Sequence, residues 1–130
     1  MDKSGMNERN LLLIDDESSA LMAFKKLLET PRTSVFIACT MQEASDSLDR
    51  RPYHVVISDL RLSGTCGMEG LEILRIAKQK NPEAILILIT AHGNSEIRKT
   101  VLHMGGSYYF EKPVLAADLR RAIAAKGGEI

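Results

Sequence analysis

Short apolar runs alternate along this chain with segments in which apolar residues recur every three or four positions. Most of the five runs are β-branched or leucine-rich on successive residues, which is typical of parallel strands that are covered on both faces. We therefore predict strands over residues 10–14, 35–38, 55–58, 85–89 and 108–110.

The segments between these runs have helical spacing and recognisable end signals. Thr40 is the predicted N-cap of a helix over residues 41–49, with Glu43 at the capping-box position. Ser18 or Ser19 is the predicted cap of the helix before it, in which Leu21, Phe24, Leu27 and Leu28 share one face. Further helices are predicted over residues 68–80, from Asn94 or Ser95 to about Gly105, and over residues 115–125.

Strict alternation of five strands with five helices predicts an α/β fold, a flavodoxin-like (βα)5 three-layer sandwich. Its five-stranded parallel sheet would be doubly wound, so ligands should bind outside the carboxyl ends of the strands. We expect a loose leader over residues 1–9, one domain over residues 10–126, and the start of a linker, or a chain end, over residues 127–130.

Composition narrows the functional classes. Among 130 residues, 17 basic and 17 acidic side chains cancel, so charge gives no reason to expect direct nucleic-acid or membrane binding. The longest apolar run, residues 84–91, is too short to cross a bilayer. Cys39 and Cys66 form no metal-ligand pattern, and no secretory signal is present, so we expect reduced thiols in a cytoplasmic protein.

Polar residues follow four of the five predicted strands and should meet at one edge of the sheet. A carboxylate cluster needs a cation at neutral pH, and an all-oxygen site suits Mg²⁺. A carboxylate can also attack phosphorus, while an amine and a hydroxyl would bind the transferring phosphoryl group. These residues are Asp15, Asp16, Asp59, Thr90 and Lys112.

Four motifs occur in this order: LLLIDDE, VVISDLRL, ILILITAHG and YYFEKP. Together they resemble the receiver domain of bacterial two-component response regulators, from about residue 10 to residue 125. The resemblance implies that Asp59 is the phosphoacceptor and that a sensor histidine kinase or a phosphotransfer protein supplies the phosphoryl group. It also implies that the domain catalyses only its own phosphorylation and dephosphorylation, and is otherwise not an enzyme.

The same resemblance implies roles for the other strand-end residues. Mg²⁺ would be held by Asp16, Asp59 and the backbone carbonyl of Arg61, with Asp15 acting mainly through water. Lys112 would pair with Asp59 or its phosphoryl group, and the bond from Lys112 to Pro113 would be cis. Thr90 and Tyr109 would be the switch residues.

Phosphorylation in the family changes the surface formed by the fourth helix, the fifth strand and the fifth helix. That surface would serve a downstream effector domain or protein, and a phosphorylation-dependent homodimer is a further expectation. The motifs ISDLRL and ITAHG are similar to receivers attached to transcription activators of the ATPase-driven type, so transcription regulation is one expected output.

Three residues near the site are expected to set the lifetime of the phosphoryl group. Ala91 leaves space for it to enter, whereas Arg61 would partly screen it from water. His92 occupies a family position that borders it, although an exposed loop histidine is an equally good interpretation. We therefore expect slow to moderate autodephosphorylation.

The chain departs from the family pattern after Asp59. A proline is usual four residues on, but Ser63 stands there, and the matching glycine is Gly70. Residues 63–67 thus look like an insertion of about three residues, and this looser loop would alter Mg²⁺ affinity or kinase access. Cys66 in this loop is better interpreted as a passive thiol than as a regulatory one.

Two other functional classes remain open at this point. An aspartyl-nucleophile phosphohydrolase acting on external phosphoesters would usually carry an aspartate where Arg61 stands, and would need a cap domain. A flavodoxin-like cofactor binder would need a phosphate-binding loop after the first strand, where Asp15, Asp16 and Glu17 stand instead. Those three acidic residues taken alone would also fit the plain role of helix capping.

Overall fold

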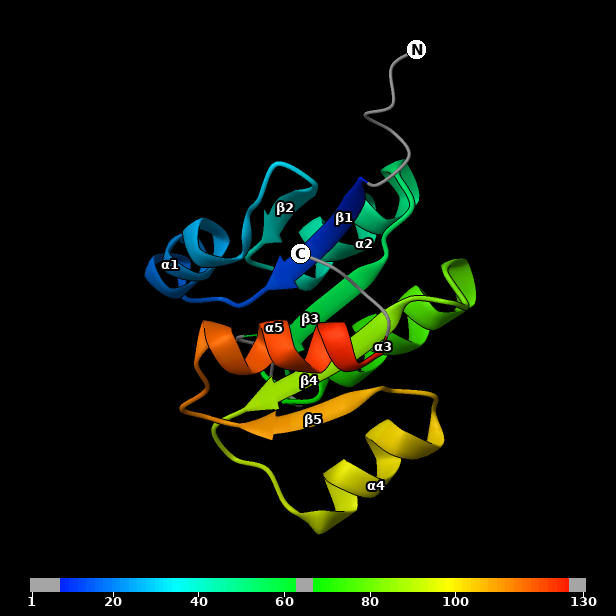
Figure 1. Ribbon diagram of the computed structural model, residues 1–130. Helices are drawn as coiled ribbons and strands as arrows, with labels where there is room; N and C mark the ends of the chain where they lie inside the picture. The colour runs from blue at the N-terminus through cyan, green and yellow to red at the C-terminus, as the bar shows by residue number, and fades with distance from the viewer. Residues whose placement is uncertain (1–7, 63–66, 127–130) are drawn as a thin grey trace.

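The computed structural model describes residues 8–62 and 67–126, which form one sheet covered by helices on both faces (Figure 1). All neighbouring strands are parallel, and their order is β2-β1-β3-β4-β5. The order reverses between β1 and β3, which makes their carboxyl ends the place where a ligand is expected. The strands are β1 (Arg9–Ile14), β2 (Thr33–Ala38), β3 (Val55–Asp59), β4 (Ile85–Thr90) and β5 (Tyr108–Glu111).

The helices divide between the two faces of the sheet. Helices α1 and α5 cover one face, and α2, α3 and α4 cover the other (Figure 1). This arrangement confirms the predicted doubly wound α/β fold. The helices are α1 (Ser18–Leu28), α2 (Met41–Arg50), α3 (Glu69–Lys80), α4 (Ser95–His103) and α5 (Ala116–Ala125).

Each strand contributes to two separate cores because successive side chains point to opposite faces. In β4, Leu86 and Leu88 pack in the core under α2, α3 and α4, whereas Ile87 and Ile89 pack under α1 and α5. Every residue of β4 is buried. Each fully buried Leu or Ile side chain stabilises the fold by roughly 1.5–3 kcal/mol relative to exposure, so the two cores fix the strand ends firmly.

Helix starts follow the predicted caps in two cases and differ in a third. Thr40 accepts a hydrogen bond from the Glu43 amide, and Asn94 accepts one from the Ile97 amide. The predicted cap of α1 at Ser18 or Ser19 is wrong, because both residues already lie in the helix and Glu17 is its N-cap residue, without a side-chain cap. The Glu17 amide instead donates to Asp15 Oδ1 at 3.0 Å.

Some boundaries also differ from the predicted ones. Arg9, expected in the leader, belongs to β1, since its amide donates to the carbonyl of Arg32. The expectations for residues 1–7, for residues 127–130, and for the loop over residues 63–66 with Cys66 lie outside the described residues. Within the described part of the chain, no helix is long and apolar enough to cross a bilayer.

Candidate functional site

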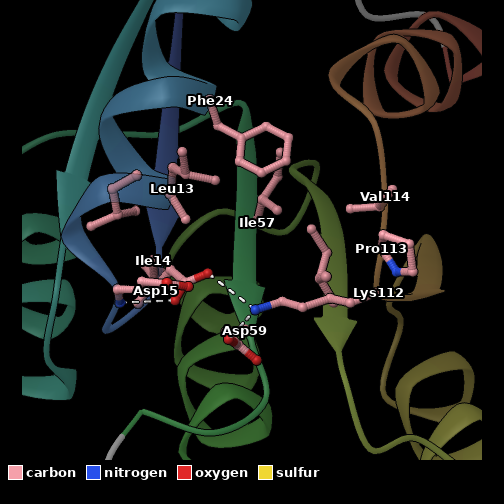
Figure 2. Close-up of a pocket in the computed structure, with 13 residues that line it drawn as sticks. Leu13, Ile14, Asp15, Phe24, Ile57, Asp59, Lys112, Pro113 and Val114 are labelled. Carbon is pink, nitrogen blue, oxygen red and sulfur yellow. Dashed lines mark hydrogen bonds and ion pairs between the residues drawn. The ribbon is translucent and has the colours of Figure 1, made fainter.

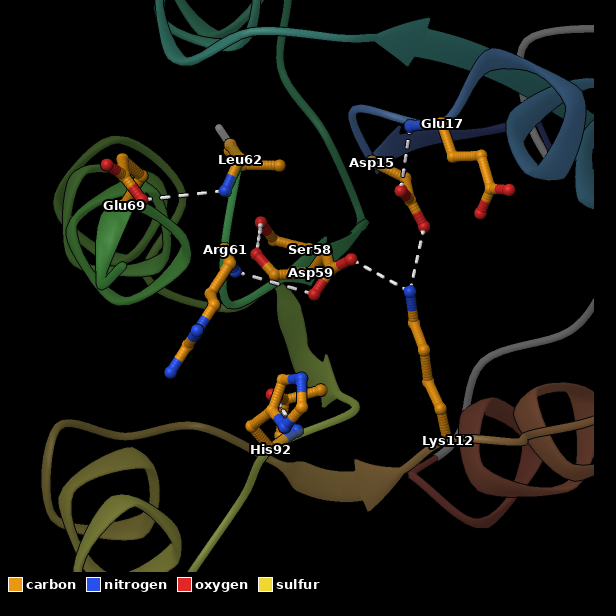
Figure 3. A network of polar contacts seen from close by, with 10 residues as sticks. Asp15, Glu17, Ser58, Asp59, Arg61, Leu62, Glu69, His92 and Lys112 are labelled. Carbon is orange, nitrogen blue, oxygen red and sulfur yellow. Dashed lines mark hydrogen bonds and ion pairs between the residues drawn. The ribbon is translucent and has the colours of Figure 1, made fainter. Parts of the chain in front are cut away.

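Three charged side chains meet at the carboxyl ends of β1, β3 and β5 (Figure 3). The Lys112 amine lies 2.8 Å from Asp59 Oδ2 and 3.3 Å from Asp15 Oδ2. Asp59 is the last residue of β3, and Asp15 and Lys112 each follow directly after a strand. The strand-end rule thus brings together residues that are 53 and 97 positions apart in the chain.

Burial governs the ionisation of Asp59, which is only 9% exposed. Loss of hydration raises the pKa of its carboxyl group, and the charge of Asp15 raises it further. The hydrogen bond and charge of Lys112, and the Arg61 amide 3.4 Å from Asp59 Oδ1, act in the opposite direction. The positive charge near Asp59 therefore does not balance the negative charge, because the single Lys112 amine pairs with both Asp59 and Asp15.

The Lys112 amine keeps its proton in this setting. Burial alone would lower the pKa of Lys112, but the hydrogen bond to Asp59 and the charges of Asp59 and Asp15 outweigh it, so the pKa is raised. The backbone also holds Lys112 in place, since its amide donates to the Thr90 carbonyl at 2.8 Å.

Asp15, Asp16 and Asp59 can each offer an oxygen so that all three atoms lie within 4.8 Å of one another. Three carboxylates with one amine leave an excess of negative charge, and oxygen donors suit a hard divalent cation. The donor set therefore fits a metal ion. Asp16 is exposed, so an ion held there would stay open to solvent on one side.

Thr90 lies at the end of β4 with 1% of its surface exposed. Its Oγ1 accepts a hydrogen bond from the His92 amide at 3.0 Å, which ties the hydroxyl to the turn before α4. Ala91 and His92 are themselves exposed. Their exposure leaves the approach to the site open on this side.

A family model described as the response regulator receiver domain matches residues 11–124 of this chain. The chain belongs to the response regulator receiver family. The photosynthetic apparatus regulatory protein RegA of Rhodobacter capsulatus is 31% identical over 93% of this chain and 64% of its own length. The alginate biosynthesis transcriptional regulatory protein AlgB of Pseudomonas putida is 31% identical over 95% of this chain and 27% of its own length.

Solved structures agree with this assignment. The receiver domain protein (CheY-like) of Methanospirillum hungatei JF-1 superposes with a TM-score of 0.82 at 28% identity, over 92% of this chain and 93% of that one. This receiver domain spans less than two thirds of the curated relatives RegA and AlgB.

The bond from Lys112 to Pro113 is cis in this receiver domain, as the resemblance implies. Pro113 and Val114 form one wall of a cavity of about 380 Å³ beside the acidic site, opposite Phe24 of α1 (Figure 2). Lys112 and Asp59 lie at its polar end (Figure 2). The apolar side of the cavity keeps part of the surroundings of Asp59 poor in water, which is consistent with its raised pKa.

Gly70, the glycine that matches the family position, lies against the backbone of Asp59. A Cβ at this position would lie 2.1 Å from the Asp59 carbonyl oxygen and 2.7 Å from Leu60 Cα. The Gly70 amide donates to the Leu60 carbonyl at 2.9 Å. The start of α3 thus approaches the end of β3 more closely than any side chain would allow.

Arg61 and two of the histidines lie less directly at the site. The Arg61 side chain is exposed and points away from Asp59 (Figure 3), with Nε 3.4 Å from where a Cβ of Gly67 would lie. His103 is exposed on α4, and His54 lies at the opposite end of β3, where Nδ1 accepts from the Asn10 amide at 3.0 Å.

Two contacts of the receiver domain were missed by sequence reasoning. The Tyr109 hydroxyl donates to Glu111 Oε2 at 3.1 Å, and it lies where a side chain on residue 93 would be. The signal for the first was available, because residues two apart in a strand share a face. The second depends on the path of the loop before α4, which no local pattern specifies.

Proposed function

We propose that Asp59 of this receiver domain accepts a phosphoryl group from the phosphohistidine of a sensor histidine kinase or a phosphotransfer protein. The observation that carries the proposal is the Lys112 amine, which lies 2.8 Å from Asp59 and 3.3 Å from Asp15 at the carboxyl edge of the sheet. In the reaction a carboxylate oxygen of Asp59 attacks phosphorus. One O–P bond forms, the N–P bond of phosphohistidine breaks, and the imidazole leaves with the electron pair.

We assign Mg²⁺ to the acidic cluster, held by Asp16, Asp59 and the Arg61 carbonyl, with Asp15 acting through water. When bound, the ion supplies positive charge that offsets the charge of the phosphoryl group. Lys112 supplies a second positive charge from the other side. Its pKa, raised by Asp59 and Asp15, keeps the amine protonated beside the two acids.

Thr90 is assigned as the hydroxyl that binds a phosphoryl oxygen, and Tyr109 as the residue that responds to it. The response would alter the surface of α4, β5 and α5, which would contact a downstream effector or a second copy of the domain. RegA and AlgB are named as regulatory proteins, so control of transcription in the cytoplasm is the output we propose. Residues 9–126, from the start of β1 to the end of the described chain, would form the phosphoacceptor unit.

The decisive experiment is incubation with acetyl phosphate and Mg²⁺, followed by intact mass measurement. We expect the wild type to gain one phosphoryl group, whereas Asp59→Asn should gain none. Asp49→Asn is the matched control, because Asp49 is an exposed carboxylate that pairs with Lys80 on a distant surface, and it should be phosphorylated normally. A wild type that stays unmodified while hydrolysing phosphoesters would favour the phosphohydrolase instead.

The lifetime of the phosphoryl group tests three further assignments. We expect the wild type to release phosphate at a slow to moderate rate after loading with acetyl phosphate. The variants Arg61→Ala and His92→Ala should each change that rate. Ala91 borders the same approach, so a larger side chain there should also change it. Unchanged rates in all three variants would remove these residues from the proposal.

A further inference from the structure

Ser58 is a polar side chain inside the buried strand β3, directly before the proposed phosphoacceptor Asp59. Its exposed fraction is 0%. By the alternation of strand residues, its side chain shares a face of the sheet with Val56, which packs in the core under α3. A buried hydroxyl needs a hydrogen-bond partner, and the Ser58 hydroxyl donates to the Asp59 carbonyl oxygen at 2.9 Å (Figure 3).

This hydrogen bond fixes one end of the peptide group that joins Asp59 to Leu60. At the other end of the same group, the Leu60 amide donates to the Ile89 carbonyl of β4 at 2.9 Å. The next peptide group is held in a similar way. Its Leu60 carbonyl accepts from the Gly70 amide at 2.9 Å, and its Arg61 amide lies 3.4 Å from Asp59 Oδ1. The chain is therefore held at each step from Asp59 to Arg61.

These two peptide groups connect two of the assigned metal ligands, the Asp59 carboxylate and the Arg61 carbonyl. The Leu60 amide and the Leu60 carbonyl are held by backbone groups of β4 and α3. The Asp59 carbonyl is held by a side chain, so this contact can be removed by substitution. The same carbonyl lies against Gly70, where a Cβ would be 2.1 Å from its oxygen. Helix α3 thus limits the carbonyl from one side, and the Ser58 hydroxyl sets its direction.

We propose that Ser58 is a positioning residue for the metal site, because its hydroxyl holds the Asp59–Leu60 peptide group so that the Asp59 carboxylate and the Arg61 carbonyl face the same ion. This inference rests on the proposed function, in which both groups bind Mg²⁺. Without the hydroxyl, the peptide group tilts in the metal-free protein, and the ion must restore its direction on binding. Part of the binding free energy is then spent on this reordering, so Mg²⁺ binds more weakly.

The test is calorimetric titration of the metal-free protein with Mg²⁺, well below the melting temperature of each variant. We expect Ser58→Ala to raise the Kd for Mg²⁺ about 2–10-fold, the range that the loss of one hydrogen bond permits. Ser58→Cys keeps a side chain of similar size, but a thiol is only a weak donor, so it should raise the Kd by a similar factor. A Ser58→Cys protein with the wild-type Kd would show that filling the space is sufficient, and would overturn the proposal.

Val56→Ala separates positioning from stability. Val56 lies two residues earlier on the same face of β3, is fully buried, and has no hydrogen-bonding group in its side chain. This variant should unfold at a lower urea concentration than the wild type, because it leaves a cavity, yet it should bind Mg²⁺ with the wild-type Kd. If Val56→Ala weakened Mg²⁺ binding as much as Ser58→Ala, loss of packing would explain both results, and the proposal would be overturned.

Hydrogen exchange of the Leu60 amide provides a second measurement, which needs no metal. This amide belongs to the same peptide group as the Asp59 carbonyl and donates to Ile89. We expect it to exchange faster, relative to the amides of β4, in both Ser58→Ala and Ser58→Cys. The ratio should stay at the wild-type value in Val56→Ala. A wild-type ratio in the two Ser58 variants would also overturn the proposal.

The two proposals fail in different ways. Equal Kd values in the wild type and Ser58→Ala, with Asp59 still phosphorylated by acetyl phosphate, would remove the role of Ser58 and leave the proposed function intact. A wild type that binds no Mg²⁺ and gains no phosphoryl group would overturn the proposed function and, with it, this inference.

Discussion

Replacing Gly70 by alanine tests how closely the edge of the sheet beside Asp59 is packed. The new Cβ would start 2.1 Å from the Asp59 carbonyl oxygen and 2.9 Å from its carbonyl carbon. Real Cβ atoms essentially never approach closer than 3.0 Å, so α3 and β3 must separate by about 1 Å. The obstacle is backbone on both sides, which no rotamer change relieves.

The expected cost follows from three contributions. Overpacking a tight contact costs about 1–3 kcal/mol. Stretching the bond from the Gly70 amide to the Leu60 carbonyl, now 2.9 Å, costs about 1 kcal/mol more. Alanine recovers up to about 1 kcal/mol of helix propensity. We therefore expect a net loss of about 1–3 kcal/mol, or roughly 3–12 °C in the melting temperature for a domain of this size.

The measurement is urea unfolding followed by circular dichroism, without Mg²⁺. Gln79→Ala and Gln79→Gly, at an exposed position of α3, measure the propensity difference between alanine and glycine in the same helix. After that correction, a Gly70→Ala protein as stable as the wild type would refute the reasoning. Because the displaced carbonyl belongs to Asp59, the variant should also bind Mg²⁺ more weakly.

Three further predictions concern charge, metal and capping. Burial raises the pKa of Asp59, so between the unfolded and the folded pKa the folded protein holds a proton that the unfolded chain releases. In metal-free buffer, the free energy of unfolding should therefore fall as the pH rises from about 4 through the raised pKa. The Asp59→Asn variant should lose this dependence on pH. Mg²⁺ at 100 times its Kd should raise the free energy of unfolding by about 2.7 kcal/mol in the same urea assay. The Asp15→Asn variant should show a smaller gain. A gain equal to that of the wild type would exclude Asp15 from the metal site. Thr40→Ala removes the cap of α2 and should lower the free energy of unfolding by about 1 kcal/mol. Ser34→Ala, at an exposed position of β2, should lower it little. Equal losses of stability in thermal melts would contradict the capping role.

The arrangement of the sheet was predictable because it depends on patterns of many residues. Runs such as residues 85–89 are apolar at every position, and the structure buries all of β4 accordingly. Parallel strands then bring their carboxyl ends to one edge whatever the details of the loops. For that reason the meeting of Asp15, Asp59 and Lys112 could be predicted without knowing a single side-chain conformation.

Features that depend on one loop conformation could not be predicted in this way. Ser18 and Ser19 are good capping residues, yet Glu17 is the N-cap residue, and its amide donates to Asp15 Oδ1. Similarly, the Tyr109 side chain was assigned a role from its position, but its contact with Gly93 depends on the three-dimensional path of the chain before α4. Local propensity is a weak guide where a neighbouring side chain binds the backbone, as Asp15 does.

The order in which the chain is synthesised gives the Lys112 ion pairs a further consequence. Asp15 and Asp59 leave the ribosome long before Lys112, which follows them by 97 and 53 positions. Until β5 joins the edge of the sheet, the two acids lack the amine that pairs with both of them. Under the proposed role of Lys112, a partly synthesised or truncated chain ending before β5 would be unable to accept the phosphoryl group, so that competence for phosphorylation would report that the whole domain has folded.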